Sequence, residues 1–123
     1  MQLTKRRILC VDDDDDTRWM LSIMLGQAGY EVKSASGVAE ALKLVRTECF
    51  DLYLLDRTFA DGTGLELCRR IREFDTQTPV VFFSGLALES DRQLGLEAGA
   101  QVHLVKPDDL GRLVDTVTQL SAS

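Results

Sequence analysis

The residues best suited to chemistry are acidic, and they stand directly after short apolar runs. Five consecutive aspartates, Asp12 to Asp16, follow the run Ile8–Val11, and Asp56 follows Leu52–Leu55. Because carboxylate oxygens are the ligands that Mg²⁺ prefers in proteins, two such groups brought together would form a site for a hard divalent cation. A carboxylate held beside Mg²⁺ is also a competent nucleophile toward phosphorus, and the product is an acyl phosphate.

Two further apolar runs end in residues that could contact a phosphoryl group. Ser84 and Gly85 follow Val80–Phe83, and Lys106 follows Val102–Val105. A serine hydroxyl can donate a hydrogen bond to a phosphoryl oxygen, and an ammonium group can neutralise another. Without a cation, two carboxylates ~4 Å apart repel by about 4 kcal/mol at an effective dielectric constant of about 20. Mg²⁺ and Lys106 are therefore expected to make the acidic cluster tolerable.

Strand-length apolar runs alternate with stretches of helical spacing along the chain. Four runs are continuous, which suits strands buried on both faces, whereas Tyr30–Ser34 alternates as an edge strand does. Apolar residues recur at i, i+3, i+4 and i+7 within Leu21–Ala28, Val38–Val45 and Leu110–Val117. Strict β-α alternation predicts a doubly wound α/β domain with a five-stranded parallel sheet and helices on both faces.

Weaker signals complete the predicted elements. A third helix is predicted to carry Leu67, Ile71 and Phe74, and a fourth, diluted by Gly95, lies between it and the last strand. Ser36 is predicted to cap the second helix. No linker or repeat divides the chain, so we expect one domain over residues 1–123 with a core from about 7 to 120.

The carboxyl ends of the strands are where a parallel α/β sheet places its ligands, so the residues named above should meet on one rim. Asp12 and Asp13 are expected to be ligands there. For Asp14–Asp16, a helix cap and an acidic first turn is the favoured interpretation. Taken alone, Asp56 could equally be a hydrogen-bonded structural acid with Lys106 as its ion-pair partner, but coincidence on successive strand ends favours a site.

Composition excludes several classes of function. A net charge of -6 opposes the phosphate contacts that dominate nucleic-acid affinity, so no direct nucleic-acid binding is expected. Cys10, Cys49 and Cys68 lack the spacing of a zinc site and are expected to be reduced thiols, mostly buried. The apolar run near the N-terminus is too short for a signal peptide or a membrane span, which predicts a cytoplasmic location.

Taken in order, these motifs resemble the receiver domain of two-component response regulators, from about Arg7 to Leu120. Each motif is weak alone, but the ordered set is specific. The resemblance implies a flavodoxin-like strand order of 2-1-3-4-5 and a cis peptide bond before Pro107. The matching segments are Ile8–Asp13, Phe50–Asp56, Gly64–Leu65, Thr78–Gly85, Leu96–Ala100 and Lys106–Pro107.

The resemblance also implies a role for each acidic residue. Asp56 is expected to be the phosphoacceptor, and Asp12 and Asp13 the acidic pair that holds Mg²⁺ together with it. The backbone carbonyl of Thr58 is expected to supply a further metal ligand. Asp56 would then both bind the metal and receive the phosphoryl group.

Three further positions are expected to read the phosphoryl group. By the resemblance, Ser84 and Lys106 contact it. His103 stands where the family usually has tyrosine or phenylalanine as a rotamer switch. With Ser84, His103 is therefore a candidate switch residue, and the alternative interpretation is a histidine with no special role.

The predicted function is that of a phosphoacceptor module rather than an enzyme with a metabolite substrate. A sensor histidine kinase or phosphotransfer protein is expected to deliver the phosphoryl group to Asp56, with Mg²⁺ as cofactor. The domain would catalyse only its own phosphorylation and dephosphorylation, and the change would alter conformation and partner binding. A downstream effector or fused output domain, and a weak or phosphorylation-dependent dimer, remain open among the expected partners.

Three alternatives to a phosphoacceptor receiver stay open. A small Mg²⁺-dependent phosphohydrolase of the haloacid-dehalogenase type would need an acid two residues after the nucleophile, where this chain has Thr58. A flavin-binding module would need a Ser/Thr/Gly-rich phosphate loop where this chain has Asp12 to Asp16. A degenerate receiver that works without phosphorylation is the third, although the acidic and phosphoryl-reading residues are present.

Overall fold

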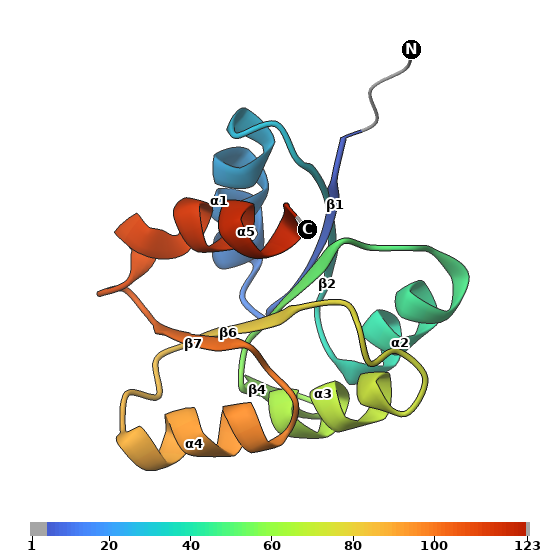
Figure 1. Cartoon of the computed structure of the whole chain (residues 1–123), viewed down its shortest axis with the longest axis vertical. Coiled ribbons are helices and arrows are strands. Elements are labelled where there is room, and N and C mark those ends of the chain that lie inside the picture. The colour runs from blue at the N-terminus through green and yellow to red at the C-terminus, as the bar shows by residue number, and fades with distance from the viewer. Residues whose placement is uncertain (1–4, 123) are drawn as a thin grey trace.

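The computed structural model describes residues 5–122 as alternating strands and helices (Figure 1). Residues 1–4 and 123, which the single-domain prediction includes, lie outside the described residues. The strands are β1 (Arg7–Val11), β2 (Glu31–Ala35), β3 (Leu52–Leu55), β4 (Thr58–Phe59), β5 (Gly62–Thr63), β6 (Val80–Ser84) and β7 (Val102–Val105). The helices are α1 (Asp15–Gln27), α2 (Val38–Thr47), α3 (Gly64–Arg72), α4 (Glu89–Glu97) and α5 (Leu113–Ser121), with a short 3₁₀ helix, η1 (Leu110–Arg112), before the last.

Five strands form one parallel sheet in the order β2-β1-β3-β6-β7. Numbered among themselves, these strands have the expected order 2-1-3-4-5, so the predicted fold is confirmed. The apolar runs predicted each central strand to within one residue at each end, because a strand covered on both faces needs apolar residues throughout. The antiparallel pair β4-β5 was not predicted, since each strand has only two residues and no apolar run.

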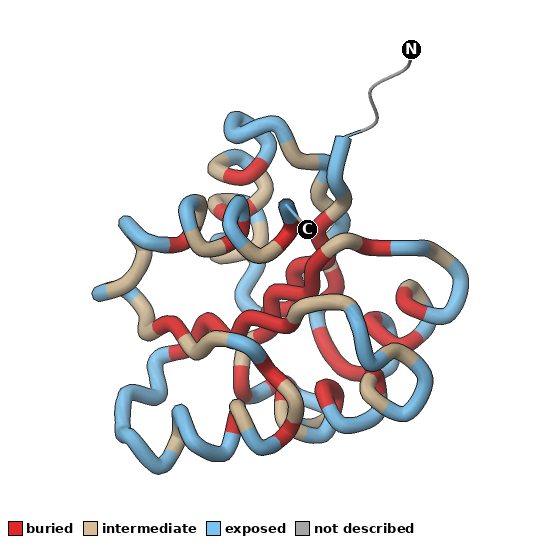
Figure 2. The backbone as a smooth tube through the Cα atoms, viewed as in Figure 1, coloured by how far each residue is buried: buried red, intermediate tan, exposed pale blue. Residues whose placement is uncertain are grey.

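Alternate residues of the strands supply two separate cores. Leu9 and Val11 face the cluster formed with α2 and α3, whereas Ile8 and Cys10 face the cluster formed with α1 and α5. Figure 2 shows the buried residues concentrated along the central strands, with the exposed sides of the helices outward. Helices therefore cover both faces of the sheet, as the alternation predicted.

Two local predictions, those for Phe74 and Ser36, need correction. Phe74 lies beyond the end of α3 and is 51% exposed, so it does not pack in the core. In α4 the buried residue is Gly95, because a side chain there would press on the ring of Phe82. Ser36 is not the cap of α2; Gly37 occupies that position, and Asp61 from the β4-β5 connection accepts hydrogen bonds from the first amides of the helix.

Among the helices formed within residues 5–122, none combines the length and the apolar character that crossing a bilayer requires.

Candidate functional site

Three carboxylates meet at the carboxyl edge of the sheet. Asp12 and Asp13 follow β1, and Asp56 follows the neighbouring strand β3. One carboxylate oxygen from each lies within 4.8 Å of the other two. Asp12 is buried, Asp56 is partly buried and Asp13 is exposed. The structure thus brings together the three acids that the sequence predicted to share a site.

Lys106 bridges two of these acids. Its Nζ donates to Asp12 Oδ2 at 2.6 Å and to Asp56 Oδ2 at 3.1 Å. Burial lowers the pKa of Lys106, but the hydrogen bond to Asp12 and the charges of Asp56 and Asp12 outweigh it, so the pKa lies above its ordinary value. Burial raises the pKa of Asp12, and hydrogen bonds from Lys106 and from the Asp14 amide oppose that effect. The contacts with Asp12 and Asp56 therefore stabilise the ammonium form of Lys106.

Backbone amides orient both of the carboxylates that Lys106 contacts. The N–H of Asp14 donates to Asp12 Oδ1 at 2.9 Å, and the N–H of Arg57 donates to Asp56 Oδ1 at 2.7 Å. Each carboxylate is thereby fixed at both oxygens. Within the described residues, Asp13 accepts no hydrogen bond and makes no ion pair, so its oxygens remain available.

The charge balance favours a divalent cation. Three carboxylates face one ammonium group, and clustered like charges repel unless a cation compensates them. The donor atoms are carboxylate oxygens from two strand ends, which is the hard, oxygen-rich set that Mg²⁺ takes in proteins. The residues present therefore fit a Mg²⁺ site, with Asp13 offering the least engaged carboxylate.

Ser84 ends β6 beside the site and is buried. Its Oγ accepts a hydrogen bond from the Leu86 amide at 3.2 Å, and its carbonyl accepts one from the Lys106 amide at 2.8 Å. The peptide bond from Lys106 to Pro107 is cis, as the resemblance implied. Ser84 is thus tied by its backbone to the same residue whose ammonium group contacts the acids.

Thr58 opens β4, where it is exposed and pairs with Thr63. No contact of its carbonyl to the acidic cluster is present among residues 5–122, and its role as a metal ligand stays a prediction. Gly64 explains how the segment after Asp56 fits: a Cβ there would lie 2.0 Å from the Asp56 carbonyl oxygen. Only glycine lets α3 begin this close to the end of β3.

His103 is tied to the segment between β6 and α4. Its Nε2 lies 2.8 Å from the carbonyl oxygen of Leu86. A carbonyl can only accept, so Nε2 carries the proton in this hydrogen bond. The other ring nitrogen, Nδ1, is buried and has no hydrogen-bond partner among residues 5–122, and the ring lies beside Phe82 at a centroid distance of 6.3 Å. The imidazole therefore contacts the backbone of the β6-α4 segment and not the acidic cluster.

Sequence reasoning missed Arg57, which directly follows Asp56. It is only 5% exposed, its Nη1 donates to the Asp91 carbonyl in α4 at 2.8 Å, and its guanidinium lies 5.5 Å from the centre of the Phe82 ring. Burial lowers the pKa of Arg57. Its place immediately after the candidate nucleophile was the one available signal, because the partner in α4 is distant in sequence.

A small, mainly apolar cavity adjoins Lys106. It has a volume of about 200 Å³ and opens between α1 and the segment after β7. The helix α1, which supplies Thr17 and Met20 to the cavity, also exposes Trp19 to 69% and Ile23 to 39%. Large exposed apolar side chains next to a charged site are typical of surfaces that contact other proteins. The cavity is lined by Thr17, Met20, Phe83, Lys106, Pro107 and Leu110.

Comparisons with known proteins agree with this geometry. The response regulator protein PilR of Pseudomonas aeruginosa is 39% identical over 115 residues, which cover 94% of this chain and 26% of PilR. The non-phosphorylated HemR receiver domain from Leptospira biflexa superposes with a TM-score of 0.89 and 32% identity, covering 97% of this chain and 96% of that one. The response regulator TrrA of Thermotoga maritima, solved in complex with Mg²⁺-BeF, has a TM-score of 0.85 and 31% identity, covering 94% and 98%.

The family model described as the response regulator receiver domain matches residues 8–118. The chain spans between about a quarter and a half of the length of the curated relatives it matches. The family match, the strand order and the acidic edge of the sheet all agree. The chain belongs to the response regulator receiver domains of two-component signalling systems.

Proposed function

We propose that Asp56 accepts a phosphoryl group from a histidine kinase or a phosphotransfer protein. The observation that carries this proposal is the environment of its carboxylate. One oxygen is held by the Arg57 amide and the other by Lys106, beside Asp12 and Asp13 at the carboxyl edge of the sheet. A nucleophile held in one orientation loses little freedom when it attacks, which lowers the barrier to transfer.

Mg²⁺ is the proposed cofactor. Asp12, Asp13 and Asp56 would hold it, together with the backbone carbonyl of Thr58. When bound, Mg²⁺ supplies positive charge that stabilises the oxygens of the transferring group. TrrA, solved in complex with Mg²⁺-BeF, supports this assignment by similarity.

The proposed transfer needs no reactant other than Asp56 and the phosphorylated histidine of the donor. A carboxylate oxygen of Asp56 forms a bond to phosphorus as the bond from phosphorus to the donor imidazole nitrogen breaks. The nitrogen keeps the electron pair, and the aspartate becomes an acyl phosphate. Lys106 remains beside the new group and stabilises its added negative charge.

Ser84, Lys106 and His103 are the proposed readers of this change. The Ser84 hydroxyl now accepts from the Leu86 amide, and His103 donates to the Leu86 carbonyl. A hydrogen bond from Ser84 to the phosphoryl group would release the Leu86 amide, and charge-assisted bonds of this kind contribute roughly 1.5–3 kcal/mol each. A gain of that size shifts a pre-existing equilibrium of the β6-α4 segment.

The exposed apolar side chains of α1 are the proposed contact for the phosphodonor. Trp19 and Ile23 lie one helical turn apart, and Met20 lines the cavity beside Lys106. A partner bound there would be next to the edge of the sheet that carries Asp56. Burial of such residues supplies the apolar centre of a protein interface.

Three curated relatives are named as transcriptional regulatory proteins, and the chain spans less than half the length of each. We therefore extend the proposal to a cytoplasmic role in which the phosphorylated domain controls an output domain or a separate effector. The domain itself would turn over no metabolite.

Phosphotransfer from acetyl phosphate in the presence of Mg²⁺, followed by intact-mass measurement, tests the assignment. We expect one added phosphoryl group on the wild-type chain and on Asp16→Asn, a matched change of an exposed aspartate in α1, and none on Asp56→Asn. Circular dichroism would establish that the Asp56→Asn variant is folded. Labelling of that folded variant would overturn the proposal, and so would a wild-type chain that takes no label, as a degenerate receiver would.

His103 is tested by amide hydrogen exchange in the β6-α4 segment. Loss of the Nε2 hydrogen bond in His103→Ala should speed exchange around Leu86, whereas His103→Gln, whose side-chain amide can still donate, should change it less. Equal exchange in wild-type and His103→Ala protein would leave the histidine without a switch role.

A further inference from the structure

Arg18 joins the first turn of α1 to the segment that carries the acidic pair. Its Nη1 donates a hydrogen bond to the backbone carbonyl oxygen of Asp12 at 2.6 Å, and its Nη2 forms an ion pair with Asp15. The Arg18 side chain is 20% exposed, whereas that of Asp15 is 90% exposed. Among residues 5–122, Arg18 makes no hydrogen bond or ion pair with any of the three clustered carboxylates. Its guanidinium therefore contacts the backbone of the candidate metal site and not the ligand atoms.

Asp13 lies between two peptide groups that are both held in place. The carbonyl of the peptide before it, from Asp12, accepts from Arg18, and within the described residues no other donor reaches that oxygen. The N–H of the peptide after it, from Asp14, donates to Asp12 Oδ1 at 2.9 Å. The planes of these two peptide groups set φ and ψ of Asp13, which in turn set the direction of its Cα–Cβ bond. The two hydrogen bonds therefore fix the direction in which the Asp13 side chain leaves the backbone.

Asp13 depends on this backbone support because its carboxylate has none of its own. Asp12 and Asp56 are each held at both oxygens. The Asp13 carboxylate accepts no hydrogen bond from residues 5–122, yet one of its oxygens lies within 4.8 Å of the other two acids. Mg²⁺ demands a nearly ideal arrangement of its ligands, so a ligand that is free to turn away binds the ion less well.

We propose that Arg18 is a positioning residue for the Mg²⁺ site. By holding the Asp12 carbonyl, it directs the Asp13 side chain toward the other two carboxylates and so raises the affinity for Mg²⁺ without being a ligand. Groups outside the ligand set that orient metal ligands commonly change metal affinity by about 10- to 100-fold. The role of Arg18 rests on the Mg²⁺ site proposed above.

The ion pair with Asp15 explains how a cation is tolerated beside a cation site. The planar guanidinium uses one nitrogen for the Asp12 carbonyl and the other for the Asp15 carboxylate. Because Asp15 is exposed, the pair itself contributes little to stability. It offsets the charge of Arg18, which thus brings a hydrogen-bond donor to the site with little net charge.

The sign of the effect separates positioning from simple charge. As a charge alone, Arg18 would repel Mg²⁺, and its removal would tighten Mg²⁺ binding. A positioning role predicts weaker binding, because the Asp12 carbonyl loses its donor and the Asp13 backbone gains conformational freedom. A merely structural role would lower the stability of the chain and leave the Mg²⁺ affinity of the folded protein unchanged.

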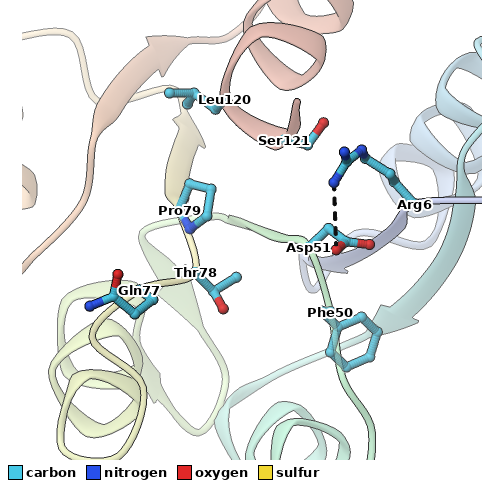
Figure 3. Close-up of a pocket in the computed structure, with 8 residues that line it drawn as sticks. All are labelled: Arg6, Phe50, Asp51, Gln77, Thr78, Pro79, Leu120 and Ser121. Carbon is cyan, nitrogen blue, oxygen red and sulfur yellow. Dashed lines mark ion pairs between the residues drawn. The ribbon is translucent and has the colours of Figure 1, made fainter. Parts of the chain in front are cut away.

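Arg6 provides a matched control at the other end of the same strand, since it precedes β1 and Asp12 follows it. Its guanidinium also reaches one carboxylate, of Asp51 at 4.0 Å, and one backbone carbonyl, of Ala122 at 3.4 Å. Figure 3 shows this ion pair beside a cavity of about 350 Å³. None of the residues that line this cavity belongs to the acidic cluster. Removal of Arg6 therefore takes away the same charge and the same kinds of contact without affecting Asp13.

Mg²⁺ titration of the unphosphorylated full chain, followed by amide NMR spectra, tests the proposal. We expect Arg18→Ala to weaken Mg²⁺ binding at least about five-fold. Arg18→Met, which keeps the apolar stem of the side chain but has no donor, should weaken it to the same extent. Arg6→Ala should stay within about two-fold of the wild type, and so should Asp15→Asn, which leaves the bond to the Asp12 carbonyl in place. The same spectra show whether each variant is folded.

Phosphotransfer from acetyl phosphate supplies a second measurement. At saturating Mg²⁺ the rate for Arg18→Ala should approach that of the wild type, whereas the Mg²⁺ concentration for half-maximal rate should rise by the same factor as the dissociation constant. A wild-type chain that binds Mg²⁺ but takes no label would contradict the phosphoacceptor assignment and leave the role of Arg18 intact.

Three results would overturn the role of Arg18. The first is Mg²⁺ binding by folded Arg18→Ala or Arg18→Met that equals or exceeds that of the wild type. The second is a loss in Asp15→Asn as large as in the Arg18 variants, because the ion pair and not the carbonyl contact would then be responsible. The third is a wild-type chain that binds no Mg²⁺.

Discussion

Arg57 and Asp91 join the end of β3 to the first turn of α4. The Nη1 of Arg57 donates to the carbonyl oxygen of Asp91 at 2.8 Å, with the guanidinium over the face of Phe82. Since Arg57 directly follows Asp56, the residue next to the proposed phosphoacceptor holds the start of α4. A change at Asp56 therefore has a short covalent and hydrogen-bonded path to that helix.

Arg57→Ala should lower the free energy of unfolding by about 1–3 kcal/mol, because it removes the side-chain hydrogen bond to the Asp91 carbonyl and a buried cation-π contact. Arg92→Ala is the control, because Arg92 lies in α4 next to Asp91. Its guanidinium pairs with Glu89 in solvent, and such exposed pairs contribute little to stability. Urea denaturation of both variants measures the difference, and equal losses would show that the Arg57 contact has no special weight.

Gly64→Ala should destabilise the fold strongly, by about 3 kcal/mol or more, since the new Cβ would meet the Asp56 carbonyl oxygen at 2.0 Å and force backbone atoms apart. Gly26→Ala provides the contrast. It lies in α1 with nothing within 4 Å of its added Cβ, so it should stabilise by about 0.5–1 kcal/mol. Thermal melts of the two variants that shift in the same direction would contradict this account.

Asp13→Asn should make the metal-free protein slightly more stable, by about 0.5 kcal/mol, because it removes one of three clustered carboxylates. The same change should reduce the stabilisation that millimolar Mg²⁺ gives, since a ligand that binds only the folded state raises its stability. Denaturation of Asp13→Asn and Asp16→Asn with and without Mg²⁺ checks both effects. A Mg²⁺ response equal to that of the wild type would remove Asp13 from the site.

Asp61 should make the stability depend on pH. Hydrogen bonds from the Ala39 and Val38 amides hold the pKa of its carboxyl below the ordinary value of 3.8. The stabilisation is therefore present above pH 3.8 and is lost as the pH falls through the lower pKa of the folded state. Asp61→Ala should be less stable than wild type at pH 7, and the gap should narrow in acid. A gap that stays constant down to pH 3 would contradict the assignment.

Much of the fold follows from local pattern. Continuous apolar runs predicted the central strands because each is buried on both faces, and helical spacing predicted the faces of α1 and α2. The pattern failed where contacts with residues distant in the sequence decide which side chains are buried. Phe74 has an apolar type but a solvent-exposed position, and Gly95 is buried because the Phe82 ring needs the space.

The candidate site was predictable to the same extent. Residues after parallel strands must meet at one edge, so Asp12, Asp56 and Lys106 could be expected together. Hydrogen bonds from side chains to backbone groups distant in the sequence could not be predicted. Arg57 reaches the Asp91 carbonyl and Asp61 reaches the amides that open α2, and neither contact leaves a periodic signal in the sequence.

The central claim is that Asp56 carries the phosphoryl group and that Mg²⁺ is needed for its transfer. Borohydride reduction of the acyl phosphate, followed by peptide mapping, locates the modified carboxyl group directly. We predict homoserine at position 56 after transfer in Mg²⁺, with none when the metal is removed by chelation. Homoserine at another aspartate, or modification at position 56 that is equally efficient without Mg²⁺, would contradict the account.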